Sequence, residues 1–366
     1  MKLTRPQPAR PPALSVVLPV YNAAPFLQMA LDSLTAQTFS DFELIAVDDG
    51  STDSSLQILR RQAARDSRLR VTSRANTGIV GALNDGLAGA RAPFIARMDA
   101  DDAAAPERFA RQLARFEAEP GLVALGSAVT FMDAAGYSVQ SCPRLLAHAE
   151  IEQALLAGDG GALIHPAVMF RADAVRAAGG YRVFQPEAQY YEDLDLFLRL
   201  ARLGVLANLA EPLLRYRVHA GSINFTRDAG RHEVKLAVLR EAYAARGLAF
   251  DPAQFPELAL GHGDPAAHAR EWAASSLAYG SRRVAVGHGW NAVCLRPRDT
   301  ASWQALRYAL VSAASLCWNA AGEHLFANVL HVQYVLSRVI TALIVSNAWN
   351  YPLQRFFVFG ERRAAP

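Results

Sequence analysis

The chain has 366 residues, of which 52% are hydrophobic and 19% are charged, a composition typical of a globular protein with a large core and not of a disordered or fibrous chain. Its 37 basic and 34 acidic residues nearly balance, so the sequence indicates no nucleic-acid partner. Cys142, Cys294 and Cys317 are widely spaced and odd in number, which excludes a zinc-binding pattern and a disulfide framework and favours a cytoplasmic setting.

The length predicts two domains preceded by a short tail. Met1–Pro12 carries three basic residues and four prolines but no apolar segment. We therefore expect residues 1–13 to form a disordered, basic, proline-rich tail and not a secretory signal peptide.

Short β-branched runs alternate with helical stretches through the first two-thirds of the chain. The predicted strands are Leu14–Pro19, Phe42–Val47, Leu69–Ser73 and Phe94–Met98, and the predicted helices are Pro25 to about Gln37, about Asp53 to Ala64, and Gly78–Ala90. Repeated strand–helix–strand units predict an α/β domain with a mainly parallel sheet and helices on both faces.

Beyond about Arg227 the pattern changes to helices, including a predicted hairpin of His268–Tyr279 and Arg282–Leu295 around Gly280. We expect an α/β domain over residues 14–228 and an α-helical accessory domain over residues 229–366. Leu325–Phe359 is apolar-rich but is interrupted by polar residues, so a membrane span is not predicted there.

Acidic residues follow two of the predicted strands, at the sheet edge where such folds bind ligands. Asp99 and Asp101 are separated by one residue, which places both carboxylates on the same side of an extended segment, while Asp102 is expected to point elsewhere. Such a pair could hold a divalent cation beside a diphosphate. The alternative is that the cluster only caps a helix beginning near Pro106.

Asp48 and Asp49 end the second strand before Gly50, which permits a tight turn. Their carboxylates could accept hydrogen bonds from a nucleotide base or a ribose, or could merely shape a strand-to-helix turn.

A third acidic group begins the helical stretch Tyr190–Arg202. Glu192 and Asp193 fall in its first turn, where the helix dipole favours negative charge, so a stabilising role explains them adequately. The functional alternative is that one of them acts as a general base on an acceptor hydroxyl.

At this point the chain resembles family 2 of the inverting glycosyltransferases, which have the GT-A fold and include many enzymes of bacterial polysaccharide biosynthesis. The resemblance runs from Leu14 to about Phe225 and rests on the order and spacing of nine motifs, none of them specific alone. These are LPVYN from Leu18, QTF from Gln37, VDDGSTD from Val47, NTGIVGALNDGL from Asn76, IARMDADD from Ile95, His165-Pro166, Gly179-Gly180-Tyr181, EDLDLFLRL from Glu192 and YRVHAGS from Tyr216.

The resemblance implies a metal-assisted transfer of a sugar from a nucleoside-diphosphate donor, in a single displacement that inverts the anomeric carbon. A divalent cation, Mn²⁺ or Mg²⁺, is the implied cofactor, and uridine is the favoured base, with thymidine as the alternative. Asp193 matches the catalytic base. The implied donor-binding residues are Pro19, Tyr21, Asp48, Asp49, Asn76, Gly78, Asn84 and Asp99, and the implied metal ligands are Asp99, Asp101 and His219. A loop histidine facing solvent is an equally good interpretation of His219.

One departure concerns the positive group that assists the diphosphate. Many relatives have arginine where this chain has Leu83, and Arg97 is a candidate that could instead only pack or form an ion pair.

Other classes of function fit less well. A nucleotidyltransferase or a dinucleotide-dependent oxidoreductase would show a glycine-rich phosphate loop after the first strand, and Leu18–Ala24 has none. A catalytically degenerate protein that acts as a helical interaction module remains the alternative.

The expected acceptor is a glycan or a lipid-linked sugar in cell-surface polysaccharide or glycolipid assembly. Aromatic and basic residues of the C-terminal helices could lie on the cytoplasmic face of the inner membrane, or could form an ordinary helical core or oligomer contact. They are Trp303, Trp318, Trp349, Tyr351, Phe356, Phe357, Arg338, Arg355, Arg362 and Arg363.

Overall fold

The computed structural model describes residues 10–185, 190–219, 230–257, 264–331, 333–350 and 353. The chain divides into two compact units. The first comprises residues 1–131, 141–217 and 227–258, and the second comprises residues 132–140, 218–226 and 259–366. Most of the expected tail, residues 1–9, lies outside the described part.

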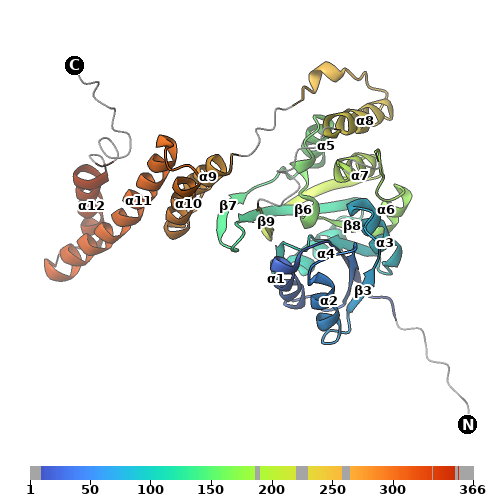
Figure 1. Cartoon of the computed structure of the whole chain (residues 1–366), viewed down its shortest axis with the longest axis horizontal. Helices are drawn as coiled ribbons and strands as arrows, with labels where there is room; N and C mark the ends of the chain where they lie inside the picture. The colour runs from blue at the N-terminus through green and yellow to red at the C-terminus, as the bar shows by residue number, and fades with distance from the viewer. Residues whose placement is uncertain are drawn as a thin grey trace, which may run out of the picture. The chain divides into compact units, whose positions relative to one another are not determined.

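The sheet has nine strands in the order β3-β2-β1-β4-β8-β6-β9-β5, with β7 paired to β6. The labelled strands β8, β6 and β9 lie next to one another in Figure 1. The first four strands are β1 (Leu14–Val20), β2 (Phe42–Asp48), β3 (Leu69–Ser73) and β4 (Phe94–Arg97). They pair in parallel, as their alternation with helices predicts. All four agree with the predicted strands to within one residue.

The other half of the sheet contains antiparallel pairs, which the sequence pattern did not predict. The remaining strands are β5 (Ala103–Ala104), β6 (Leu122–Met132), β7 (Ser138–Cys142), β8 (Met169–Arg171) and β9 (Val205–Arg217). β8 pairs antiparallel with both β4 and β6, and β5 pairs antiparallel with β9. The β5–β9 pair holds the segment after Asp101 against the strand that ends at Arg217.

Two hydrophobic clusters cover the two faces of the sheet. Val17 of β1 points into one cluster and its neighbours Val16 and Leu18 point into the other, as the alternation of side chains along a strand requires. Apolar residues of α3, α5, α6, α7 and α8 join the first cluster, and those of α1, α2 and α4 join the second. Their bounds are α1 (Ala24–Thr35), α2 (Ser55–Ala63), α3 (Ile79–Gly89), α4 (Arg108–Ala118), α5 (His148–Leu156), α6 (Ala172–Ala177), α7 (Glu192–Leu200) and α8 (Arg231–Ala244).

The first unit continues past the boundary that we expected near residue 228. Val234, Val238 and Leu239 of α8 are buried in the same cluster as the apolar residues of α5 and α7. Helix α8 therefore belongs to the core of the α/β unit, although its sequence has the same helical character as the segment that follows.

The second unit is helical. Its helices are α9 (Pro265–Ala278), α10 (Arg282–Leu295), α11 (Thr300–His324) and α12 (Tyr334–Ile344), with π-helical turns at Leu325–Val329 and Val345–Asn350. Helices α9 and α10 form the predicted hairpin, and Gly280 adopts a φ of 94° at its turn. His288 of α10 contacts Asp133 at 3.2 Å, within the same unit. Among the described residues, no helix has both the length and the apolar character that a membrane crossing requires.

Candidate active site

The carboxyl ends of β2 and β3 are joined by the side chain of Asp48. This residue is 1% exposed, and its carboxylate accepts hydrogen bonds from the Ser73 hydroxyl at 2.8 Å and from the backbone N–H of Ser51 at 3.3 Å. Asp48 thus fixes the start of the turn that leaves β2, and these two hydrogen bonds describe a structural role.

Asp49 shapes the loop before α3. Its two carboxylate oxygens accept the backbone N–H groups of Thr77 at 3.1 Å and Gly78 at 2.9 Å. Gly78 has a φ of 89°, and Gly50 has a φ of 74°, both in the left-handed region that favours glycine. A Cβ at Gly50 would also lie 2.8 Å from the Asn76 backbone nitrogen, so this turn and the loop require the glycine.

Three further predicted donor-site residues lie beside these turns with different exposure. Pro19 is buried within β1, whereas the Asn76 side chain is exposed. Tyr21 follows β1 directly and is 54% exposed. An exposed aromatic ring at a strand end is a surface on which a nucleotide base could stack.

Asn84 has a well-defined partner in the first unit. Its amide nitrogen donates to the Tyr181 carbonyl at 2.9 Å, and its amide oxygen accepts the Tyr181 N–H at 3.0 Å. A Cβ at Gly180, which has a φ of 69°, would come 2.9 Å from this oxygen. Asn84 therefore fastens α3 to the turn after α6, and both of its amide groups are used in doing so.

Three aspartates converge after β4. One carboxylate oxygen from each of Asp99, Asp101 and Asp102 lies within 4.8 Å of the others. Our expectation that Asp102 points elsewhere is wrong: it is 1% exposed, and one of its oxygens accepts the Arg217 N–H at 2.7 Å. Its other oxygen has no partner among the described residues. Burial, together with the charges of Asp101 and Asp99, raises the pKa of Asp102 well above its usual value.

Arg97 binds Asp99 through both terminal nitrogens of its guanidinium. Nη1 contacts Oδ2 and Nη2 contacts Oδ1, each at 2.6 Å. The Arg97 side chain is only 6% exposed, so little water screens the attraction between its guanidinium and the Asp99 carboxylate. Of the two interpretations of Arg97 that the sequence left open, an ion pair describes this geometry.

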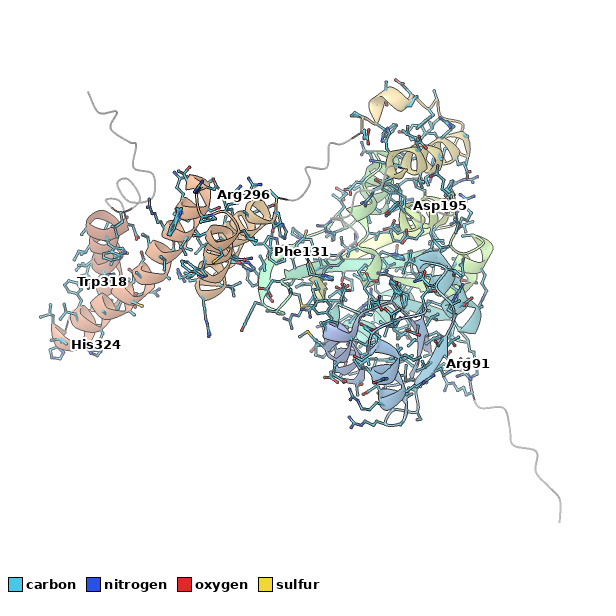
Figure 2. The ribbon with its side chains drawn as sticks, in the orientation of Figure 1. Arg91, Phe131, Asp195, Arg296, Trp318 and His324 are labelled. Atoms are coloured by element: carbon cyan, nitrogen blue, oxygen red, sulfur yellow. The ribbon has the colours of Figure 1, made fainter. Side chains whose placement is uncertain are left out.

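The start of α7 carries the next acidic residues. Glu192 and Asp193 begin the helix directly after Tyr191, which has a φ of 59°. Asp193 accepts the Leu194 N–H at 2.7 Å. Asp195, labelled in Figure 2, is instead paired with Arg182 and Arg199 and is 2% exposed, so it serves the packing of the helix.

A buried histidine and tyrosine lie behind these carboxylates. His165 Nε2 is 2.7 Å from the Tyr181 hydroxyl, and His165 Nδ1 is 3.9 Å from Glu192 Oε1. Burial, assisted by the charge of Arg97, lowers the pKa of His165 well below its usual range, so the ring is neutral. His165-Pro166 and Gly179-Gly180-Tyr181 belong to two separate motifs of the resemblance, and nothing in their spacing indicates that His165 and Tyr181 meet.

The charges of these groups act on one another. Burial and the charges of Asp101 and Asp193 raise the pKa of Asp99, against the opposing charge of Arg97. Burial also raises the pKa of Asp193, and burial together with Asp193 raises the pKa of Glu192 to about 8. Asp193 acts on the pKa of Asp99 and Asp99 acts on that of Glu192, so the end of β4 and the start of α7 lie within electrostatic reach of each other.

Comparison with known proteins identifies the family. Residues 15–178 match Glycosyl transferase family 2. The chain is 34% identical over 240 residues to the amylovoran biosynthesis glycosyltransferase AmsE of Erwinia amylovora, covering 64% of this chain and 87% of AmsE. It is 31% identical over 231 residues to the putative glycosyltransferase EpsE of Bacillus subtilis, covering 62% of this chain and 80% of EpsE. The chain belongs to glycosyl transferase family 2.

As a family 2 glycosyltransferase it has the expected α/β fold of the GT-A type. A crystal structure of S. aureus TarS (residues 1–349) in complex with UDP-GlcNAc aligns with a TM-score of 0.53 and 18% identity, over 93% of this chain and 92% of that one. In addition, residues 291–359 match the GtrA/DPMS transmembrane domain.

One predicted metal ligand of this glycosyltransferase falls outside the site described above. His219 follows β9 and is half-buried, but it belongs to the second compact unit. Its approach to the three aspartates therefore stays a prediction.

Proposed function

We propose that this glycosyltransferase moves a sugar from a nucleoside-diphosphate donor to an acceptor hydroxyl with inversion at the anomeric carbon. The observation that carries the proposal is the convergence of Asp99, Asp101 and Asp102, with Asp193 close enough to raise the pKa of Asp99. A donor diphosphate needs positive charge beside it and an acceptor hydroxyl needs a base, and this arrangement of carboxylates can provide for both.

The nucleotide would bind at the carboxyl ends of β1 and β2. Tyr21 offers an exposed ring, and Asp49 holds the loop before α3 in a fixed conformation. Asp48 accepts the backbone N–H of Ser51 and so holds the turn after β2, and Asn76 lies exposed on the loop before α3. A uridine nucleotide is the donor we favour, and the UDP-GlcNAc named for the TarS structure agrees with this choice.

The aspartate cluster fits a divalent cation. Carboxylate oxygens are the ligands that Mg²⁺ and Mn²⁺ prefer, and the unpartnered buried oxygen of Asp102 would gain one. We therefore assign Asp99, Asp101 and Asp102 as the residues that would hold it. Such an ion, when bound, neutralises negative charge on a departing diphosphate.

Asp193 would act as the general base. As the acceptor oxygen forms its bond to the anomeric carbon, the bond to the diphosphate breaks and the hydroxyl proton passes to the Asp193 carboxylate. The Leu194 N–H holds one oxygen of that carboxylate in place. Inversion in one displacement requires no covalent sugar–enzyme intermediate, so one base suffices.

The acceptor would be a glycan or a lipid-linked sugar. AmsE is named for amylovoran biosynthesis, and by analogy we place this enzyme in the assembly of a cell-surface polysaccharide or glycolipid on the cytoplasmic face of the membrane. The match of residues 291–359 to a transmembrane domain supports contact with lipid through the C-terminal helices.

The distribution of polar and apolar side chains on α12 also supports contact with lipid. Ser337 and Thr341 are buried, and a Cβ at Gly322 of α11 would lie 2.5 Å from Thr341 Cγ2, so small residues pack these two helices closely. The apolar side chains instead face outward, including Trp318 on α11 (Figure 2). The exposed set is Trp318, Leu325, Val329, Leu330, Val335, Leu336, Val339, Leu343 and Ile344. Tyr351, Arg355, Phe356, Phe357, Arg362 and Arg363 lie outside the described residues.

Flotation with liposomes of anionic bacterial lipid tests this contact. We expect the full-length protein to float with the vesicles and a Leu336→Asp, Val339→Asp variant to remain at the bottom while keeping its helical circular dichroism. A Leu203→Asp, Leu248→Asp variant, which alters exposed leucines of the first unit, is the matched control. Equal flotation of all three proteins would contradict a lipid-binding role for α12.

Calorimetric titration with UDP, dTDP and GDP tests the donor site, with and without Mn²⁺, alongside Asp101→Ala. Metal-dependent binding of one nucleotide, lost in the variant, is the expected result. If none binds to the folded protein, the chain is a degenerate member of its family, and an interaction role for the helical unit becomes the better hypothesis.

A further inference from the structure

Two basic residues of α8 lie beside the loop that borders the proposed base. We propose that Arg231 and Lys235 form a subsite, next to Asp193, for a phosphate group that the acceptor carries. The proposal rests on the proposed function, because Asp193 marks the side from which the acceptor approaches. It also names the chemical class of the acceptor, which is a sugar that bears a phosphate.

The loop that follows α5 brings Lys235 and Asp193 to the same place. Helices α5, α7 and α8 lie next to one another (Figure 1), and residues 158–161 come directly after α5. A Cβ at Gly158, which has a φ of 81°, would lie 2.8 Å from Lys235 Nζ. A Cβ at Gly160 would lie 3.9 and 4.0 Å from the two carboxylate oxygens of Asp193. One short glycine-rich loop therefore borders both the lysine and the proposed base.

Arg231 is fixed at the start of α7. Its guanidinium lies over the rings of Tyr190 and Tyr191, 5.1 and 5.5 Å from their centres. Tyr191 immediately precedes α7, two residues before Asp193. Because Arg231 and Lys235 are four residues apart on α8, their side chains leave the same face of that helix. The two cations therefore lie beside the first turn of α7 and the loop next to it.

Two nitrogen atoms of Arg231 lack hydrogen-bond acceptors. Within the described part of the chain, Nε and Nη1 are buried and have no partner. Guanidinium N–H groups that are removed from water without an acceptor cost free energy, and a bound anion would offset that cost. Stacking on two tyrosine rings holds the guanidinium plane in one orientation, which favours recognition of a phosphate by two N–H groups at once.

The charge of the pair favours a phosphate over a carboxylate. A guanidinium and an ammonium supply two positive charges, which match a phosphate dianion, whereas a carboxylate carries a single negative charge. The charge of Asp159 acts on Lys235, but Asp159 Oδ1 accepts the Gly161 N–H at 2.9 Å. Arg231 is the first residue of α8, where the helix dipole disfavours a cation, so the stability of the helix does not explain its presence.

The position of the pair fits the acceptor and not the donor. The charge of Arg231 lowers the pKa of Asp193, against burial, which raises it. At the end of β4, by contrast, Arg97 is the cation that lowers the pKa of Asp99. A phosphate bound by Arg231 and Lys235 would therefore belong to the molecule whose hydroxyl meets Asp193.

Lysine labelling gives a local measure of phosphate binding, because Lys2 and Lys235 are the only lysines of the sequence. The full-length protein is labelled with [ε-¹³C]lysine, and the resonance that Lys235→Gln lacks is assigned to Lys235. We expect inorganic phosphate to shift this resonance saturably, and acetate at the same ionic strength to leave it in place. The absence of a saturable shift with phosphate, or an equal response to acetate, would overturn the proposal.

Variants of two arginines on α8 test the second cation. Arg231→Gln should weaken phosphate binding about tenfold or more, the loss expected for one charge-assisted hydrogen bond. Arg240→Gln, which changes an exposed arginine further along α8, is the matched control and should leave the binding unchanged. Equal phosphate affinities in the two variants would exclude Arg231 from the subsite.

A filled donor site separates the two possible sources of the phosphate. The shift of the Lys235 resonance should persist when UDP and Mg²⁺ are saturating. If UDP with Mg²⁺ abolishes it, or if Arg231→Gln loses UDP binding as Asp101→Ala is expected to, the pair binds the donor diphosphate and the acceptor subsite is wrong. Because phosphate binding is also measured without nucleotide, failure of this proposal is distinguishable from failure of the proposed function.

Discussion

The Arg97 guanidinium engages both carboxylate oxygens of Asp99, each at 2.6 Å, at the point where β4 ends. Arg97 and Asp99 are only two residues apart in the chain, so the pair lies within one short segment. Its backbone is also fixed, because the Arg97 carbonyl accepts a hydrogen bond from buried Arg108 at 2.8 Å and the Arg97 N–H donates to Val168 at 3.0 Å. The pair therefore presents Asp99 to the site with its negative charge already opposed by a neighbouring cation.

Removal of this cation should disturb both the fold and the metal affinity. We expect Arg97→Met to lower the free energy of unfolding by about 1–3 kcal/mol, because it removes a charge-assisted pair whose arginine is buried while the Asp99 side chain is 29% exposed. Arg97→Lys should retain part of the stability but not the two-point contact with Asp99. Thermal denaturation measures the first effect and Mn²⁺ titration the second. Wild-type stability in Arg97→Met would show that the pair contributes nothing.

The third aspartate can be tested separately from the other two. Asp102→Asn keeps an acceptor oxygen for the Arg217 N–H, so the β9 end should remain in place. It removes a carboxylate that can ligate the ion, and we expect Mn²⁺ affinity to fall roughly tenfold or more, since the number of carboxylate ligands governs affinity at oxygen sites. Isothermal titration with Mn²⁺ and UDP measures this. Asp133→Asn, in the second unit, is the control, and equal affinities in the two variants would exclude Asp102 as a ligand.

The first half of the sheet and its acidic strand ends could be predicted because each is encoded locally. Strands β1 to β4 are short β-branched runs separated by helices, and Asp48 is the last residue of β2 while Asp99 lies two residues after β4. The antiparallel half was missed because a strand as short as Met169–Arg171 carries no periodic signal, and its place depends on partners far along the chain.

The candidate site was likewise predictable only where its residues follow one another in the chain. Pairs such as Asn84–Tyr181 and His165–Glu192 join segments 97 and 27 residues apart, and no spacing in the sequence indicates which side chains meet. Asp102 was misjudged for a related reason. The alternation rule holds in a regular strand, but the chain turns after Arg97, where β4 ends, and brings the third carboxylate back to the other two.

Asn84 offers a test of the connection between α3 and the turn after α6. Asn84→Ala leaves the Tyr181 N–H and carbonyl without their partners, which should cost about 1–3 kcal/mol of unfolding free energy. We also expect weaker donor binding, because α3 follows the loop that Asp49 holds. Denaturant unfolding and nucleotide titration measure the two effects. Ala88→Ser, which changes an exposed residue of the same helix, serves for comparison, and an equally small effect of both substitutions would argue against a positioning role for Asn84.

The proposed base should be separable from donor binding. Asp193→Asn keeps the size of the side chain and an oxygen to accept the Leu194 N–H, so α7 should begin at the same residue. It removes the group that takes the acceptor proton, and kcat should fall by about a hundredfold or more. Binding of the nucleotide with Mn²⁺ should change little. Transfer assays and calorimetry on the same preparation give both values, and an active Asp193→Asn enzyme would require another base.

The raised pKa of Glu192 predicts how stability depends on pH, without any substrate. The pKa is about 8 in the folded protein, where burial and Asp193 oppose the ionised form, and about 4.3 in an unfolded chain. The folded state therefore binds this proton more tightly, so the stabilisation is complete below about pH 4 and is lost progressively as the pH rises to 8. Each unit of pKa difference corresponds to about 1.4 kcal/mol. We expect Tm to fall more steeply between pH 5 and 8 in the wild type than in Glu192→Gln, which carries no titrating proton at this position, so that the variant is the more stable protein at pH 8. If Tm changes with pH to the same extent in both proteins, Glu192 ionises in the folded protein as it does in an unfolded chain.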